Sequence, residues 1–151
     1  MNSSGDRVAI GAYHNDGTGS NAGHVRIYEY ASGSWSQLGS DIDGEAANDA
    51  SGRSVSMNSS GDRVAIGAYL NDGTAAEAGH VRIYEYSSGS WSQLGSDIDG
   101  EAAGDFFGMS VSMNAAGDRV AIGATNNNGT ATDAGHVRIY EYSSGSWSQL
   151  G

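Results

Sequence analysis

The chain contains 151 residues and carries a formal net charge of −11 at pH 7, and its seven basic residues are all arginine. Such an acidic surface repels nucleic acid and anionic membranes, and no apolar run approaches the roughly 18 residues that a membrane-spanning helix needs. The chain has no cysteine, which excludes disulfide bonds and cysteine-based zinc sites. We therefore expect no nucleic-acid partner and no membrane insertion.

The sequence is a tandem repeat. The segment GHVRIYEY occurs three times without a change, at 23–30, 79–86 and 135–142. The repeat units are 1–56, 57–112 and a shorter 113–151, which has no counterpart of 40–56. A repeat of this length is typical of solenoids, propellers and repeat arrays, so we treat the three units as parts of one module.

Short runs of alternating apolar and polar residues predict four antiparallel strands in the second unit, at 53–58, 61–69, 79–86 and 90–95. Short glycine-containing hairpin loops alternate with longer loops at 70–79 and 95–108. Tandem sheets of four antiparallel strands are the blades of a β-propeller. A β-solenoid is the alternative, although its coils are usually shorter and lack tight hairpins. The expected fold is all-β, with β-propeller blades of four antiparallel strands and about three repeats per chain.

The number of predicted strands favours self-association. Repeat one supplies three strands, because its own first strand would precede Met1, and the other repeats supply four each. A closed propeller has typically four to eight blades, so the chain alone cannot close a ring. Because the exposed sheet at each end repeats sequences found inside, head-to-tail contact is favoured. We expect a homodimer with six blades; the alternative is a fragment of a longer propeller.

The stretch FGMSVSMNAAGDRVAIGA at 107–124, followed by GHVRIYEY, resembles the FG-GAP repeats of integrin-α-like β-propellers. Phe107 and Gly108 match the first two letters of that motif, and Gly67 and Ala68 match the next two. Two features depart from the family: Tyr69 replaces the motif's proline, and the family's calcium loop is reduced to NSSGD or NAAGD. The resemblance implies a non-enzymatic module for binding, adhesion or scaffolding, as part of a larger extracellular or cell-surface protein.

The repeats differ mainly in their long loops, which the strand order places at one end of the sheets. Loops held on a rigid scaffold often carry binding residues, although solvent-exposed loops also drift neutrally. The candidate binding face for a protein or glycan ligand comprises His14, Asn15, Asp16, Asn71, Asp72, Glu77, Asn127, Asn128 and Asp133. In a lectin-like alternative, Trp35, Trp91 and Trp147 would be sugar platforms, one for each blade.

Two acidic loops offer oxygen ligands of the kind that calcium prefers. Their acidic residues are Asp41, Asp43, Glu45 and Asp49 in one loop, and Asp97, Asp99, Glu101 and Asp105 in the other. The alternative is that these side chains cap turns by accepting backbone N–H groups. We expect no required cofactor, and calcium is the one candidate ion.

The histidines and possible nucleophiles predict no catalytic site. His24, His80 and His136 recur before the same strand of each repeat, where a structural hydrogen bond to a neighbouring aspartate is expected. Serine, histidine and aspartate recur in every unit, whereas a catalytic group is usually singular. The sequence therefore predicts that the protein is not an enzyme.

Overall fold

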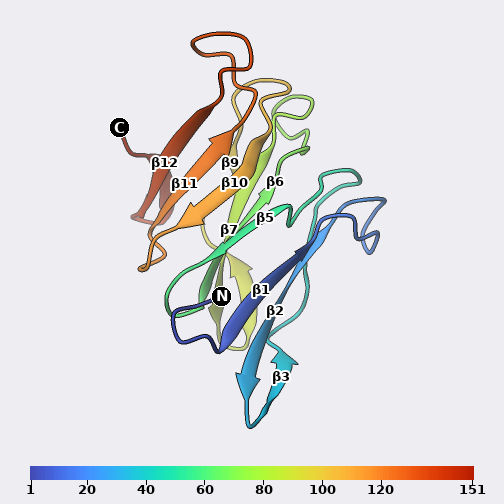
Figure 1. Cartoon of the computed structure of the whole chain (residues 1–151), viewed down its shortest axis with the longest axis vertical. Helices are drawn as coiled ribbons and strands as arrows, with labels where there is room; N and C mark the ends of the chain where they lie inside the picture. Colours follow the sequence, from blue (N-terminus) through green and yellow to red (C-terminus); the bar gives the residue numbers. More distant parts are fainter.

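The computed structural model describes all 151 residues as an all-β protein of three antiparallel sheets (Figure 1). Sheet 1 contains β1 (Arg7–Ala12), β2 (His24–Ala31), β3 (Ser34–Gln37) and β4 (Ile42–Asp43). Sheet 2 contains β5 (Ser54–Met57), β6 (Arg63–Ala68), β7 (His80–Ser87), β8 (Ser90–Gln93) and β9 (Ile98–Asp99). Sheet 3 contains β10 (Phe107–Met113), β11 (Arg119–Ala124), β12 (His136–Ser143) and β13 (Ser146–Gln149). No helix in the protein is long and apolar enough to cross a membrane.

The strand order within each sheet is sequential. Sheets 2 and 3 run β5-β6-β7-β8 and β10-β11-β12-β13, and sheet 1 runs β1-β2-β3. The predicted strands are therefore all present, three in sheet 1 and four in each of sheets 2 and 3, and sheets 1 and 2 each contain one further short strand. The sequence did not indicate β4 and β9, which pair with the first residues of β2 and β7. One edge of β2 is thus paired with both β3 and β4, and one edge of β7 with both β8 and β9.

Alternation along β7 explains why the sheets stack. Val81 and Ile83 are fully buried, whereas Arg82 and Tyr84 between and beyond them are only partly buried. In an extended strand, successive side chains point to opposite faces, so the apolar pair covers one face of the sheet. That face packs against Val120 and Ile122 of sheet 3.

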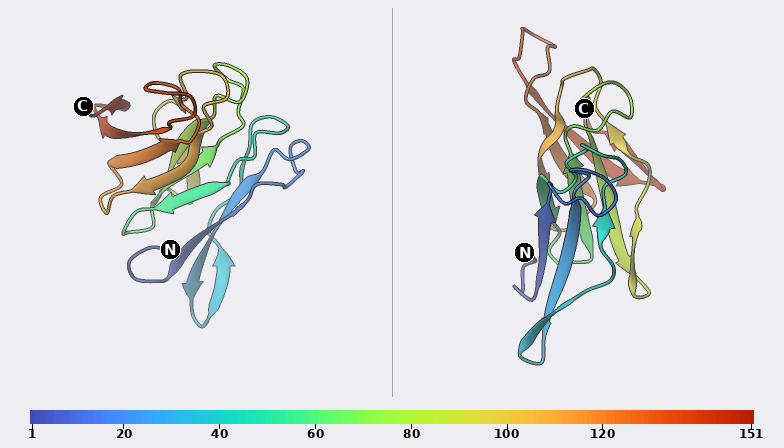
Figure 2. Two further views of the ribbon diagram at one scale, coloured as in Figure 1. Left: turned by 45° about the horizontal axis from the view of Figure 1, so that its top comes forward. Right: turned by 90° about the vertical axis from the view of Figure 1, so that its right-hand side faces the viewer.

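The core lies between neighbouring sheets rather than inside any one of them. One cluster joins Val25 and Ile27 of sheet 1 to Val64 and Ile66 of sheet 2, and the cluster around Ile83 joins sheets 2 and 3. The two views in Figure 2 show the three sheets following one another in chain order. Each unit is therefore stable only when a neighbour covers it, as in other repeat architectures.

The tight turns form a continuous row at one end of the sheets. The side-chain oxygen of Asn58 accepts backbone hydrogen bonds from Gly61, Asp62 and Arg63, which fixes the turn between β5 and β6. Gly61 has a φ of +74° and no room for a Cβ beside Asn2, so the position requires glycine. The long loops lie at the opposite end, toward the top and right of Figure 1.

Candidate functional site

The most notable polar group in the structure lies where sheet 1 meets sheet 2. His80 is the first residue of β7 and is only 4% exposed. Because β9 pairs with the start of β7, it brings the preceding Asp97 to 3.7 Å from Nδ1 of His80. Asp97 also accepts a hydrogen bond of 3.2 Å from Nε of Arg82, which lies two residues after His80 on the same face of β7.

Sheet 1 contributes the fourth member of this group. A carboxylate oxygen of Glu45, in the loop after β4, lies 4.0 Å from Nδ1 of His80, and Glu45 also forms an ion pair with Arg82. We call Glu45, His80, Arg82 and Asp97 the junction cluster. The cluster cannot form within a single repeat, because Glu45 belongs to the unit before the other three residues.

The other two histidines have less complete surroundings. His24 lies 3.6 Å from Asp41, and Arg26 pairs with the same carboxylate, but no glutamate from another unit reaches them. At the junction of sheets 2 and 3, Glu101 pairs with Arg138, but His136 has no ion-pair partner and is partly exposed. The complete cluster therefore occurs once within these 151 residues: the histidine and the arginine recur in all three units, whereas counterparts of Glu45 and Asp97 occur only in the first two.

Burial controls the protonation of the junction cluster. Removal from water lowers the pKa of His80, an effect that the nearby charges of Asp97, Asp49 and Asp99 only partly oppose. Burial, together with repulsion from Asp97, raises the pKa of Asp99. At neutral pH the imidazole of His80 is therefore uncharged. Its closest carboxylate oxygens lie beyond hydrogen-bonding distance.

Two histidine–carboxylate groups have the spacing of metal ligands. These groups are His24 with Asp41 and Asp43, and His80 with Glu45 and Asp97, and the ligand atoms of each lie within 4.8 Å of one another. Arginine already engages carboxylates in both groups. Arg26 holds Asp41 through three hydrogen bonds, and the bonds from Arg26 and Gln37 lower the pKa of Asp41. A cation would have to displace a guanidinium to bind at either position.

The four acidic residues of one loop do not converge on a common point. Asp49 is buried, accepts the backbone N–H of Ala46 and binds Asn71 of the next unit at 3.1 Å. Asp105 does the same with Ala102 and Asn127. These two residues have the turn-capping role that the sequence left open as the alternative. A calcium site in these loops stays a prediction, which would have to use the histidine–carboxylate groups.

The candidate binding-face residues mostly stabilise their own loops. Asn15, Asn71 and Asn127 each accept a backbone N–H two residues later, which forms a local turn. Asp16, Asp72 and Asn128 each accept a backbone N–H five residues later, from Asn21, Glu77 and Asp133. His14 is exposed and lies 2.9 Å from Asn21. The loops share one end of the molecule, but these residues do not enclose a common pocket.

The tryptophans are contact residues between sheets rather than open platforms. The indole N–H of Trp91 donates to the carbonyl of Leu38 in the preceding unit at 2.8 Å, and that of Trp147 donates to Leu94 at the same distance. Both rings also pack against the clusters between the sheets. Trp35 has no preceding unit in the chain and is 45% exposed. The indole N–H groups of Trp91 and Trp147 are thus already engaged, and the role of the three tryptophans as sugar platforms stays a prediction.

The comparisons with known proteins find structural relatives only. No family model and no curated protein matches the chain. A protein of Bacteroides uniformis, provisionally named 6-phosphogluconolactonase, is 12% identical with a TM-score of 0.60, over 94% of this chain and 39% of that one. A protein of Bacteroides fragilis with the same provisional name is 16% identical with a TM-score of 0.59, over 98% of this chain and 38% of that one. The chain thus spans less than two fifths of either relative, and at these identities the likeness shows the fold alone.

These findings correct two sequence-based interpretations. The resemblance to integrin-like FG-GAP propellers is wrong, since no such family model matches and the similar structures carry the name of a lactonase. The prediction of a non-enzymatic adhesion module is also wrong, because the scaffold is shared with proteins named as enzymes. The extracellular or cell-surface location stays a prediction. Phe107 and Gly108 of the supposed motif have packing roles: Phe107 is buried in the core between sheets 2 and 3, and Gly108 approaches the carbonyl of His80.

Arg82 was not predicted as a site residue. The signal was present, since an arginine follows each recurring histidine by two residues and therefore shares its face of the strand. Glu45 appeared only as a calcium ligand, because nothing in local spacing shows that it reaches the next unit.

Proposed function

We propose that the chain forms consecutive blades of an enzyme-type β-propeller and that the junction cluster hydrolyses an uncharged lactone, the cyclic ester of a hydroxy acid. The observation that carries this proposal is a buried, neutral imidazole beside an arginine, built from two successive repeat units. The blade assignment is supported by the sequential antiparallel sheets and by the structural likeness to proteins named 6-phosphogluconolactonase.

The chemistry follows from the protonation states. The neutral ring of His80 accepts a proton from water as the water oxygen attacks the lactone carbonyl. The bond between the carbonyl carbon and the ring oxygen of the lactone then breaks. The alkoxide that leaves takes up the proton from the His80 imidazolium, and the product is the open hydroxy acid. Nε and Nη2 of Arg82 bind carboxylates, which leaves the N–H groups of Nη1 for the developing oxyanion.

Charge decides the substrate class. The whole chain has a formal net charge of −11, and Glu45, Asp97 and Asp99 lie around His80 and Arg82. A phosphorylated lactone would approach against this field, whereas an uncharged lactone would not. We therefore assign the site to uncharged lactones and not to the phosphorylated compound named for the relatives.

A titration assay of lactone hydrolysis tests the proposal. Acid release from an uncharged aldonolactone is recorded at constant pH, with spontaneous hydrolysis subtracted, and a phosphorylated aldonolactone is measured in parallel. The rate of lactone hydrolysis by the His80→Gln variant is expected to be at least about 100-fold lower than that of the wild type, because a positioned general base contributes about 10²- to 10⁴-fold. The matched control is His136→Gln, at the same position of a unit without the complete cluster.

Three outcomes would overturn the proposal: a wild-type rate equal to that of buffer, equal losses in both variants, or faster hydrolysis of the phosphorylated compound. Circular dichroism of each variant establishes that the fold is retained. Restoration of part of the rate by added imidazole in His80→Gly would support a proton-transfer role for the ring.

A further inference from the structure

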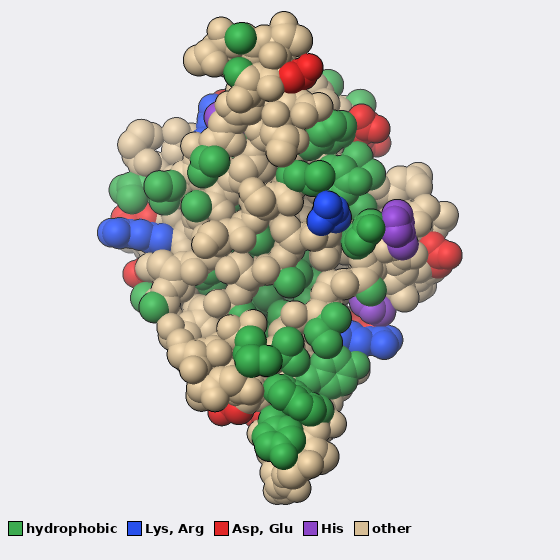
Figure 3. Space-filling model, in the orientation of Figure 1, with side chains coloured by type: hydrophobic (Ala, Val, Ile, Leu, Met, Phe, Trp, Pro, Cys, Tyr) green, Lys and Arg blue, Asp and Glu red, His purple; other side chains and the backbone are tan.

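Sheet 1 has an exposed apolar face, and the counterparts of its residues are buried in the next unit. Val8, Ile10, Tyr28 and Trp35 line a purely apolar hollow on the surface. Ile10 is 52% exposed, whereas its counterpart Ile66 is 2% exposed. Figure 3 shows this surface as a continuous apolar region over β1 to β3, at the bottom of the view.

Sheet 3 presents the complementary face at the other end of the stack. Val137 is 67% exposed and Ile139 is 44% exposed, whereas their counterparts Val81 and Ile83 are fully buried against sheet 3. Leu150 is 46% exposed, and its counterpart Leu94 packs in the core between the sheets. Each exposed face therefore has the sequence of a face that is covered elsewhere in the same molecule.

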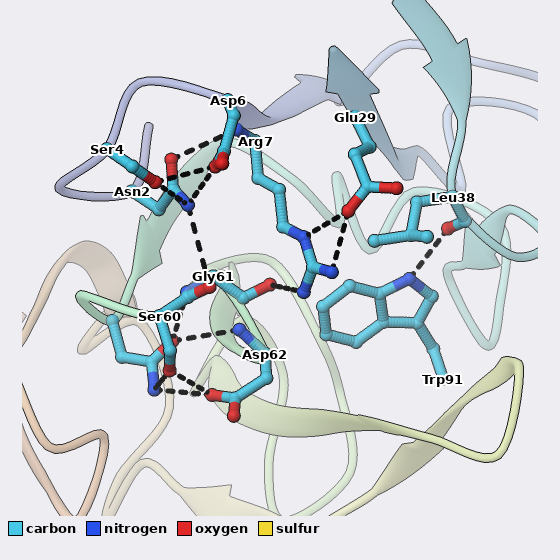
Figure 4. Close-up of polar contacts among 11 residues, drawn as sticks. Asn2, Ser4, Asp6, Arg7, Glu29, Leu38, Ser60, Gly61, Asp62 and Trp91 are labelled. Atoms are coloured by element: carbon cyan, nitrogen blue, oxygen red, sulfur yellow. Dashed lines mark hydrogen bonds and ion pairs between the residues drawn. The ribbon is translucent and has the colours of Figure 1, made fainter. Parts of the chain in front are cut away.

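The two internal junctions show which contacts recur when such faces meet. The indole N–H of the later unit donates to the leucine carbonyl of the earlier one, as Trp91 does to Leu38 in Figure 4. An arginine of the earlier unit donates to a turn carbonyl of the later one: Arg7 to Gly61 and Arg63 to Gly117, both at 3.2 Å. Both junctions thus use the same contacts at the same sequence positions.

We propose that the apolar face of sheet 3 binds the apolar face of sheet 1 of a second copy of this chain, head to tail. In this junction the indole N–H of the second copy's Trp35 donates to the carbonyl of Leu150, and Arg119 donates to the carbonyl of the second copy's Gly5. Ile139 packs against the second copy's Ile10. The occupant is identified by sequence, since the covering residues at the internal junctions are repeated at the ends of the chain.

Ring closure selects the number of copies. The two ends form a heterologous contact, and such contacts close into a ring when the rotation fits. Three sheets per chain give six sheets for two copies and nine for three, and propellers have typically four to eight. A homodimer is therefore the expected assembly. This inference does not depend on lactone hydrolysis, since neither apolar face contains a residue of the junction cluster.

Sedimentation equilibrium between about 1 and 100 µM tests the assembly, and we expect twice the monomer mass at the upper end. Ile10→Asp and Ile139→Asp each place a charge on one face, and each variant alone is expected to be a folded monomer. The matched control is Thr132→Asp, an exposed position in the long loop of sheet 3, which is expected to leave the dimer intact.

Mixing the two variants distinguishes head-to-tail association from other modes. Ile10→Asp retains its sheet 3 face and Ile139→Asp retains its sheet 1 face, so an equimolar mixture is expected to form an open heterodimer. A wild-type protein that stays monomeric at all concentrations would overturn the proposal and assign these faces to a different partner. Dimers that persist in both single variants, or a mixture that stays monomeric, would also overturn it.

Discussion

Replacement of Ile83 by alanine measures how much the contact between sheets contributes to stability. The side chain is fully buried and packs with Val120 and Ile122 of sheet 3. The substitution removes three carbon atoms, which corresponds to about 2.4 kcal/mol of lost burial at about 0.8 kcal/mol for each group. The unfilled cavity adds to this loss, so the expected decrease in the free energy of unfolding is about 2–5 kcal/mol.

Urea unfolding followed by tryptophan fluorescence gives this free energy directly, and thermal unfolding should show a decrease in Tm of about 4 °C or more. The matched control is Ile139→Ala, the same substitution at the position that is 44% exposed in the isolated chain. At concentrations where the protein is monomeric, we expect this control to lose less than about 1 kcal/mol. Equal losses for the two variants would refute the view that neighbouring sheets provide the core.

Three further predictions concern polar groups. Burial lowers the pKa of His80 below its unfolded value of about 6.5, so the unfolded chain gains this proton first as the pH falls through that range. The free energy of unfolding should therefore decrease from pH 7 to about 5.5. In paired urea titrations, the His80→Gln variant should show a smaller decrease. Asp49→Ala leaves the buried amide of Asn71 without its acceptor and should cost about 1–3 kcal/mol, whereas Asp43→Ala, at an exposed position, should change stability by less than about 0.5 kcal/mol in the same denaturation assay. Chelation of calcium should leave Tm unchanged, because arginine already neutralises Asp41 and Asp97; a decrease in Tm that added calcium reverses would restore the calcium prediction.

The strand pattern of the fold was predictable because burial on one face leaves a period of two in the sequence. The runs that contain Val64 and Ile66, and Val81 and Ile83, predict β6 and β7 directly. Strand β9 was not predictable, since it has two residues and only Ile98 is apolar. The burial of Asn71 was not predictable either, because its partner, Asp49, lies in the preceding unit.

The site was less predictable than the fold because it is assembled between units. A search for a singular catalytic residue rejects His80, since the same histidine occurs in all three repeats. Its surroundings are nevertheless unique, because Glu45 approaches from the preceding sheet and Asp97 from the following loop. The recurring histidines therefore have different environments, because only His80 has both a unit before it that contains Glu45 and a following loop that contains Asp97 within these 151 residues.

The variation among the long loops is better explained by packing than by neutral drift. In the second unit, Tyr69 contacts the ring of Phe106 edge-on, with ring centroids 5.8 Å apart. In the first unit, alanine stands at the position of Phe106, and Arg53 lies 5.5 Å from the ring of Tyr13, the counterpart of Tyr69. Both contacts have energies of about 0.5–1.5 kcal/mol.

The two substitutions are coupled by geometry. Ala50 and Phe106 both have a φ of 55°, so the backbone is conserved while the side chain changes. Where the aromatic ring is absent, a guanidinium covers the tyrosine; where the ring is present, methionine replaces that arginine at position 109. The phenyl ring introduced by Ala50→Phe should therefore compete with Arg53 for contact with the ring of Tyr13, unless Arg53→Met is added. In a double-mutant cycle we expect the pair to be more stable than the sum of the single changes, and strict additivity would favour drift.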